Sequence, residues 1–96
     1  MKYERIIKPP ESRLLKSGRV TLAPGEDIGE HVTEKREELI LILKGEAVVE
    51  KEGELIQLKH GQAHFIPEGK KHNVRNNSDK ELEYIYIVTL FDGKGQ

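Results

Sequence analysis

Hydrophobic positions in this chain fall in short runs that are separated by turns rich in glycine, proline and asparagine. The runs are roughly 5 to 9 residues long and rich in Ile, Val, Leu, Tyr and Thr, as is typical of β-strands. No window shows the 3.6-residue apolar period of an amphipathic helix. The pattern predicts an all-β protein, a sandwich or barrel. The expected strands are residues 2–8, 19–23, 29–33, 38–43, 46–51, 54–58, 63–66, 72–76 and 81–91.

Two of these segments are apolar on both faces. Residues 39–43 read Leu-Ile-Leu-Ile-Leu, and most of residues 84–91 is equally apolar. One face of each strand in a small antiparallel sheet pair normally meets water, so these strands need a cover. We predict a homodimer that buries their outer faces. In the alternative interpretation, apolar residues near the N-terminus fold over them, namely Ile6, Ile7, Leu14 and Leu15.

Composition narrows the classes of function. A chain of 96 residues makes one small domain. Its 16 basic and 17 acidic side chains are scattered and give a net charge of −1, which argues against a nucleic-acid partner. Without cysteine there is neither a disulfide framework nor a thiolate zinc site. The N-terminal residues lack a signal-peptide segment and no apolar run is long enough for a membrane helix, so we expect a cytoplasmic protein with no membrane partner.

Candidate metal ligands lie on three of the predicted strands. Pro67 and Gly69 suit a tight reversal that would place His72 at the start of a strand. His31 shares a strand face with Thr33, and Glu38 begins the next strand. Two imidazoles and a carboxylate that meet inside a barrel would suit a divalent transition metal, whether Fe, Mn, Ni, Cu or Zn.

The spacing of these residues resembles the two sequence motifs of the cupin superfamily. The second motif is Gly, five residues, Pro-x-Gly, two residues, His, three residues, Asn, and it is matched at every fixed position by Gly61, Pro67, Gly69, His72 and Asn76. The first motif is matched by Gly25, His31, Glu38 and Gly45. One residue departs from the pattern, because Thr33 stands where the family usually has a second histidine. The resemblance covers about residues 19–91.

The resemblance implies a double-stranded β-helix, which is a jelly-roll barrel of antiparallel strands. The barrel would occupy residues 19–91, after an edge strand and arm at residues 1–18 and before a flexible tail at residues 92–96. This agrees with the number of strands predicted from the hydrophobic pattern.

The resemblance also implies a metal site. A typical cupin holds its metal with three histidines and one glutamate, and this chain keeps three of the four as His31, Glu38 and His72. Thr33 would orient a water on the metal, and His64 is a candidate accessory imidazole. In the alternative interpretation, the histidines are hydrogen-bonded structural residues and Glu38 is a solvated carboxylate.

Two kinds of function are compatible with such a site. One is a metal-dependent enzyme that acts on a small molecule, in the manner of a dioxygenase or an isomerase. An isomerase would need a base beside the metal, and His64 is the only candidate in the sequence. The other is a non-catalytic cupin with a degenerate metal site that binds a sugar or another small-molecule ligand. In a third interpretation, the protein is an interaction module that functions through its dimer surface.

Overall fold

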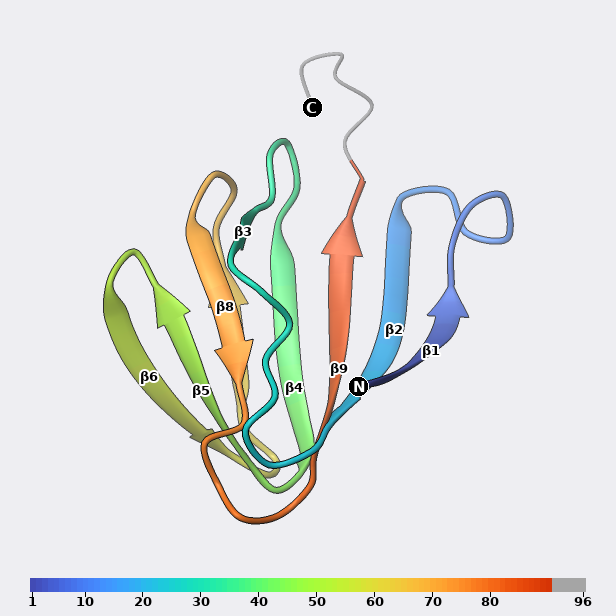
Figure 1. The fold of residues 1–96 in the computed structure, drawn as a ribbon. Coiled ribbons are helices and arrows are strands. Elements are labelled where there is room, and N and C mark those ends of the chain that lie inside the picture. The colour runs from blue at the N-terminus through green and yellow to red at the C-terminus, as the bar shows by residue number, and fades with distance from the viewer. Residues whose placement is uncertain (91–96) are drawn as a thin grey trace.

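The structure, a computed structural model, describes residues 1–90 as two antiparallel β-sheets (Figure 1). One sheet has five strands in the order β1-β2-β9-β4-β7, and the other has four in the order β3-β8-β5-β6. The strands are β1 (Lys2–Ile7), β2 (Leu15–Leu22), β3 (His31–Val32), β4 (Glu38–Lys44), β5 (Glu46–Lys51), β6 (Glu54–Lys59), β7 (Ala63–Ile66), β8 (Lys71–Arg75) and β9 (Leu82–Thr89). The part of the chain so described contains no helix long and apolar enough to cross a membrane.

The all-β architecture is confirmed, and most strands lie where the hydrophobic pattern predicts them. Two strands differ. β2 begins at Leu15, earlier than the predicted segment 19–23, because it follows β9 along its whole length. β3 contains only His31 and Val32, since the backbone turns at Gly29 (φ 92°) and Lys35 (φ 57°) on either side of it.

The predicted boundaries at residues 18 and 91 stay a prediction. Phe91 and the predicted tail, residues 92–96, lie outside the described residues.

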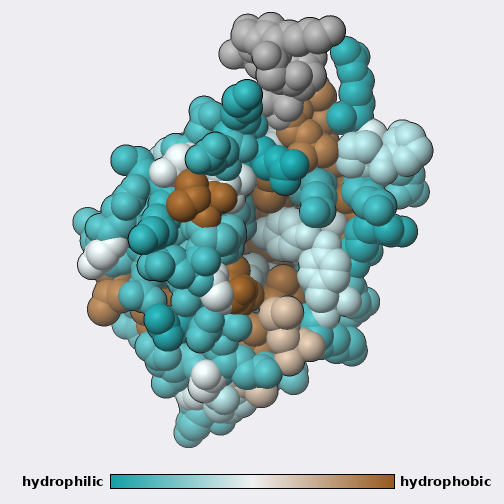
Figure 2. Space-filling view, turned by 45° about the horizontal axis from the view of Figure 1, so that its top comes forward, coloured by the Kyte–Doolittle hydropathy of each residue, from teal (hydrophilic) through white to brown (hydrophobic). Residues whose placement is uncertain are grey.

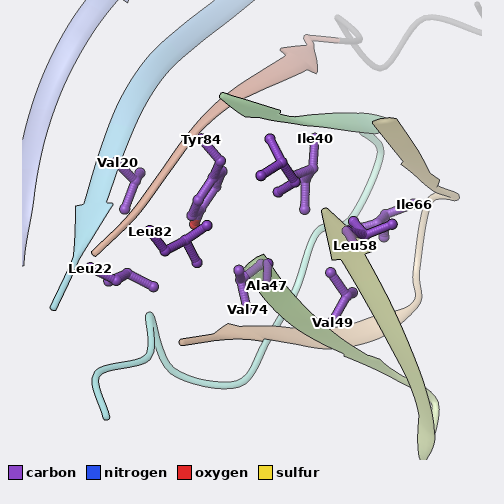
Figure 3. Close-up of a cluster of buried hydrophobic side chains, with 11 residues drawn as sticks. Val20, Leu22, Ile40, Ala47, Val49, Leu58, Ile66, Val74, Leu82 and Tyr84 are labelled. Carbon is purple, nitrogen blue, oxygen red and sulfur yellow. The ribbon is translucent and has the colours of Figure 1, made fainter. Parts of the chain in front are cut away.

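The hydrophobic core lies between the two sheets (Figure 3). It is formed by alternate residues of the strands, and Ile40 and Ile42 on β4, Val49 on β5 and Val74 on β8 have no exposed surface. Full burial of such a side chain contributes about 1.5–3 kcal/mol. The remaining members of the cluster are Val20, Leu22, Ala47, Leu58, Ile66, Leu82 and Tyr84.

The outer face of the five-stranded sheet is apolar and exposed. Leu39 on β4 is 39% exposed and is paired in register with Ile87 on β9 and with Phe65 on β7, which is 47% exposed. The N-terminal residues do not cover this face, because β1 extends the sheet at its edge and Leu14 remains 50% exposed. The structure therefore leaves these apolar side chains in solvent.

Candidate metal centre

The structure brings together the three residues that the sequence motifs indicated. His31 on β3 lies directly opposite His72 on β8, and Glu38 reaches them from the start of β4 in the other sheet. One ligand atom from each side chain can be chosen so that all of these atoms lie within 4.8 Å of one another. Glu38 and His72 are buried and His31 is exposed. Their role as metal ligands stays a prediction, but the geometry it requires is present.

Backbone hydrogen bonds fix the direction of both imidazoles. The Nδ1 atom of His72 lies 2.9 Å from the carbonyl oxygen of Lys70, and that of His31 lies 3.1 Å from the carbonyl oxygen of Gly29. A carbonyl oxygen can only accept, so each Nδ1 is the protonated, donating atom. In a neutral ring the lone pair is then on Nε2, the arrangement usual for metal-binding histidines.

The Nε2 atom of His72 is buried and makes no hydrogen bond to any described residue. It lies 3.3 Å from Glu38 Oε1, but the contact lacks hydrogen-bond geometry, and the two side chains are 0% and 8% exposed. In the neutral ring, leaving this nitrogen without a hydrogen bond costs about 1–3 kcal/mol. A divalent cation bound by this nitrogen and the carboxylate would satisfy both groups, so the donor set fits a metal ion.

Two opposing effects act on the pKa of His72. Burial lowers it, whereas Glu38 and the Lys70 carbonyl raise it, and the net pKa lies above the usual value for histidine. The carboxylate therefore favours a protonated ring when no metal is present. A proton and a metal ion compete for the same place between His72 and Glu38.

A cavity of about 300 Å³ opens beside this cluster, and Figure 2 shows the recess in the molecular surface. His31, Thr33 and Glu38 form part of its wall. Two cationic side chains, Lys16 and Arg36, line it as well. The rest of the lining consists of Met1, Tyr3, Val20, Ile28, Tyr84, Tyr86 and Val88.

The two predicted accessory residues have different positions. Thr33 is half-buried and lines the cavity with His31 and Glu38. His64 does not line the cavity, and its Nε2 lies 3.0 Å from Lys51 Nζ. Burial and the Lys51 charge lower the pKa of His64, so the neutral ring accepts a hydrogen bond from the lysine.

Lys16 and Arg36 were missed by the sequence analysis. Lys16 is the register partner of Val88, which in turn is the partner of Glu38, so the lysine lies in the same row of the sheet. Lys16 and Val20 are four residues apart, so on a strand they point to the same face. Because Val20 is a core residue, this spacing could have indicated that Lys16 faces the interior. Arg36 lay in a run of charged residues that resembled a solvated corner.

Two antiparallel sheets that enclose imidazoles from one sheet and a carboxylate from the other define a β-barrel protein with an internal candidate metal site. A family model for the cupin domain matches residues 18–88, and the chain belongs to this family. The predicted jelly-roll fold is confirmed by structural neighbours that are cupin barrels.

Three comparisons illustrate the relationship. The chain is 32% identical over 72 residues to an oxalate-binding protein from Thermotoga maritima, and the match covers 75% of this chain and 60% of the relative. The crystal structure of a predicted oxalate decarboxylase from Thermotoga maritima matches with a TM-score of 0.76 and 30% identity, over 79% of this chain and 66% of that one. The TT1209 protein from Thermus thermophilus matches with a TM-score of 0.85 and 28% identity, over 94% and 83% of the two chains. The chain thus spans less than two thirds of the length of the first two relatives.

Proposed function

We propose that this cupin binds a divalent transition metal through His31, Glu38 and His72 and uses it to hold a small carboxylate ligand. The observation that carries the proposal is the buried Nε2 atom of His72, which faces a buried carboxylate without hydrogen bonding to it. Two imidazoles and one carboxylate suit Fe, Mn, Ni, Cu or Zn. When bound, the metal would supply a Lewis acid with coordination positions left open for a ligand.

The charges beside the cluster favour an anionic ligand. Lys16 and Arg36 line the same cavity as Glu38, so together with a bound metal they give the cavity a positive potential beside the cluster. Arginine is also suited to bidentate pairing with carboxylates. The oxalate-binding relative from Thermotoga maritima agrees with this ligand class, and oxalate is the simplest probe of it.

Ligand binding is favoured over isomerisation by the position of His64 and by the protonation of the cavity tyrosines. His64, the base considered from the sequence, is hydrogen-bonded to Lys51 and lies outside the cavity wall. Burial raises the pKa of Tyr84 and of Tyr86, so these hydroxyls retain their protons. A dioxygenase-like activity is the second candidate, because two histidines and one carboxylate form the ligand set of non-haem Fe(II) oxygenases.

Metal analysis tests the proposal directly. Protein purified without a histidine tag, soaked with each metal in turn and dialysed, should retain about one equivalent per chain by elemental analysis, as a site with three protein ligands requires. His60→Ala is the control, because His60 is exposed in the turn between β6 and β7. Retention below roughly a tenth of an equivalent for every metal in this series would refute the proposal.

We also propose that two copies of the chain pair through the outer face of β4, β7 and β9. This face exposes Leu39, Leu43 and Phe65 and is not covered by any described segment. A two-fold axis would place the same apolar patch on both sides of the interface. Exposed apolar patches of this kind commonly mark contact surfaces between proteins.

A further inference from the structure

We infer that the ligand of this cavity is an organic acid with an apolar tail, bound with its carboxylate head at the metal cluster and its tail along a tyrosine-lined wall. The inference rests on the proposed metal-dependent binding of a carboxylate and specifies which carboxylates fit. It follows from how polar and apolar side chains are distributed along the cavity.

The wall contributed by the five-stranded sheet is built from rows of directly opposed residues that face the interior. The charged row contains Lys16, Val88 and Glu38. The two rows that follow along the strands are called here the aromatic rows. One contains Arg5, Gly18, Tyr86 and Ile40, and the other contains Tyr3, Val20, Tyr84 and Ile42. Rows on one face are two residues apart, so the aromatic rows lie about 7 and 13 Å from the charged row.

The aromatic rows present ring surface to the cavity, and their one charged member, Arg5, is exposed and does not line the cavity. Tyr3 and Tyr86 stack with ring centroids 6.0 Å apart and an interplanar angle of 15°. Their hydroxyl groups hydrogen-bond to each other, so each supplies the other with a polar partner. Ile28 lines the cavity as well and adds a further apolar side chain. A ligand that extends past the charged row therefore meets mainly apolar surface.

Gly18 makes this arrangement sterically feasible. A Cβ atom at position 18 would lie 2.8 Å from Tyr3 Cε2 and 3.0 Å from Tyr86 Cε1. Both distances are shorter than a normal carbon–carbon contact of about 3.5–4.0 Å. Because glycine has no side chain, the Tyr3 ring can lie across β2 and reach Tyr86. The stacked pair thus depends on residues from three strands.

Oxalate would use only part of this cavity. It is a two-carbon dianion with no apolar tail, and the metal and Lys16 in the charged row would hold its oxygens. The cavity volume, about 300 Å³, lies at the lower end of the usual range for sites that hold organic ligands. An acid with a tail would cover the solvent-accessible ring surface of Tyr3 and Tyr86, and each methylene that it buries would raise affinity by about fourfold.

A chain-length series tests the inference. Protein loaded with Ni²⁺ is titrated calorimetrically with oxalate, 2-oxopropanoate, 2-oxobutanoate, 2-oxopentanoate and 2-oxohexanoate. We expect affinity to rise about three- to fourfold per methylene along the 2-oxo acids, with 2-oxohexanoate binding more tightly than oxalate. Equal or falling affinity along the series, or oxalate as the tightest ligand, would overturn the inference. If none of the acids, oxalate included, binds the loaded protein, the proposed carboxylate binding itself is wrong.

A wall variant separates tail binding from head binding. Tyr3 is 47% exposed on an edge strand, so Tyr3→Ser should fold and should lower the affinity for 2-oxohexanoate about tenfold while leaving 2-oxopropanoate unchanged. Ile28→Ser, elsewhere in the cavity wall, should have the same selective effect. The matched control is Leu55→Ser on β6, where the side chain is 68% exposed and outside the cavity. Equal losses for both acids, or no loss for either in both wall variants, would contradict the placement of the tail.

Discussion

His31 and His72 lie directly opposite each other on neighbouring antiparallel strands, with ring centroids 4.2 Å apart. Each ring donates from Nδ1 to the carbonyl oxygen of the residue two positions before it, Gly29 for one and Lys70 for the other. The two imidazoles are therefore held in the same way, each by a residue just before its own strand. The four-stranded sheet supplies this pair as a unit, and the other sheet adds Glu38.

Removing either imidazole should weaken metal binding by about tenfold or more, since even the loss of a group that merely orients a ligand has an effect of this size. His31→Ala is the cleaner variant, because His31 is exposed and its truncation leaves no buried void. Competition with a chelating dye of known affinity measures the effect. His60→Ala should bind metal as the unmodified protein does. Equal affinity in His31→Ala and the unmodified protein would show that His31 is not a ligand.

Completing the usual cupin ligand set should tighten the site. Thr33 lines the cavity together with His31 and Glu38, so an imidazole at position 33 would lie on the same side as the existing cluster. We expect Thr33→His to increase metal affinity by about tenfold. The same dye competition measures it, with Thr21→His on β2 as the control outside the cavity. An unchanged affinity in Thr33→His would mean that residue 33 is too far from the metal to coordinate it.

The pH dependence of stability should reverse when metal is added. The pKa of His72 is raised in the folded protein, so its ion pair with Glu38 stabilises the metal-free fold below the ordinary histidine pKa and is lost as pH rises through the raised value. A bound metal requires the unprotonated ring, so its stabilisation grows as pH rises. The difference in Tm between metal-loaded and chelator-treated protein should therefore increase from about pH 6 to 8.

His64 must be removed from this measurement, because its pKa is lowered and its contribution to stability has the opposite sign. Thermal melts are therefore compared in a His64→Gln background. In that background, the chelator-treated protein should lose stability as pH rises through the raised pKa of His72. A gain in stability over the same interval would contradict the assigned ion pair between His72 and Glu38.

The sequence predicted the candidate ligands because motif spacing and strand alternation are local properties. His31, Glu38 and His72 each occupy a fixed position relative to a turn, and glycine or proline marks the turns before His31 and His72. The residues of the cavity wall were harder to predict from the sequence. Lys16 joins the row of Glu38 only through the pairing of β2 with β9 and of β9 with β4, and such long-range register is not encoded in the periodicity of any one strand.

The apolar outer face of β4 was likewise predictable from local sequence, whereas the surface that covers it was not. The sequence showed that residues 39–43 would be apolar on both faces, and the structure leaves Leu39 and Leu43 exposed at 39% each. Covering these two leucines requires a surface from another molecule. An isologous dimer is the simplest cover, because one apolar patch then provides both halves of the interface.

A charge placed in this face should separate the two copies. Leu39 is paired in register with Ile87 and Phe65, so Leu39→Lys would put an ammonium group among apolar neighbours that a dimer would desolvate. Sedimentation velocity should show a dimer for the unmodified protein at micromolar concentration and a monomer for the variant. Leu55→Lys, on the other sheet and 68% exposed, should remain dimeric. If the unmodified protein is a monomer at every concentration, the exposed leucines do not mediate self-association. If Leu39→Lys remains a dimer, the interface lies on another surface of the protein.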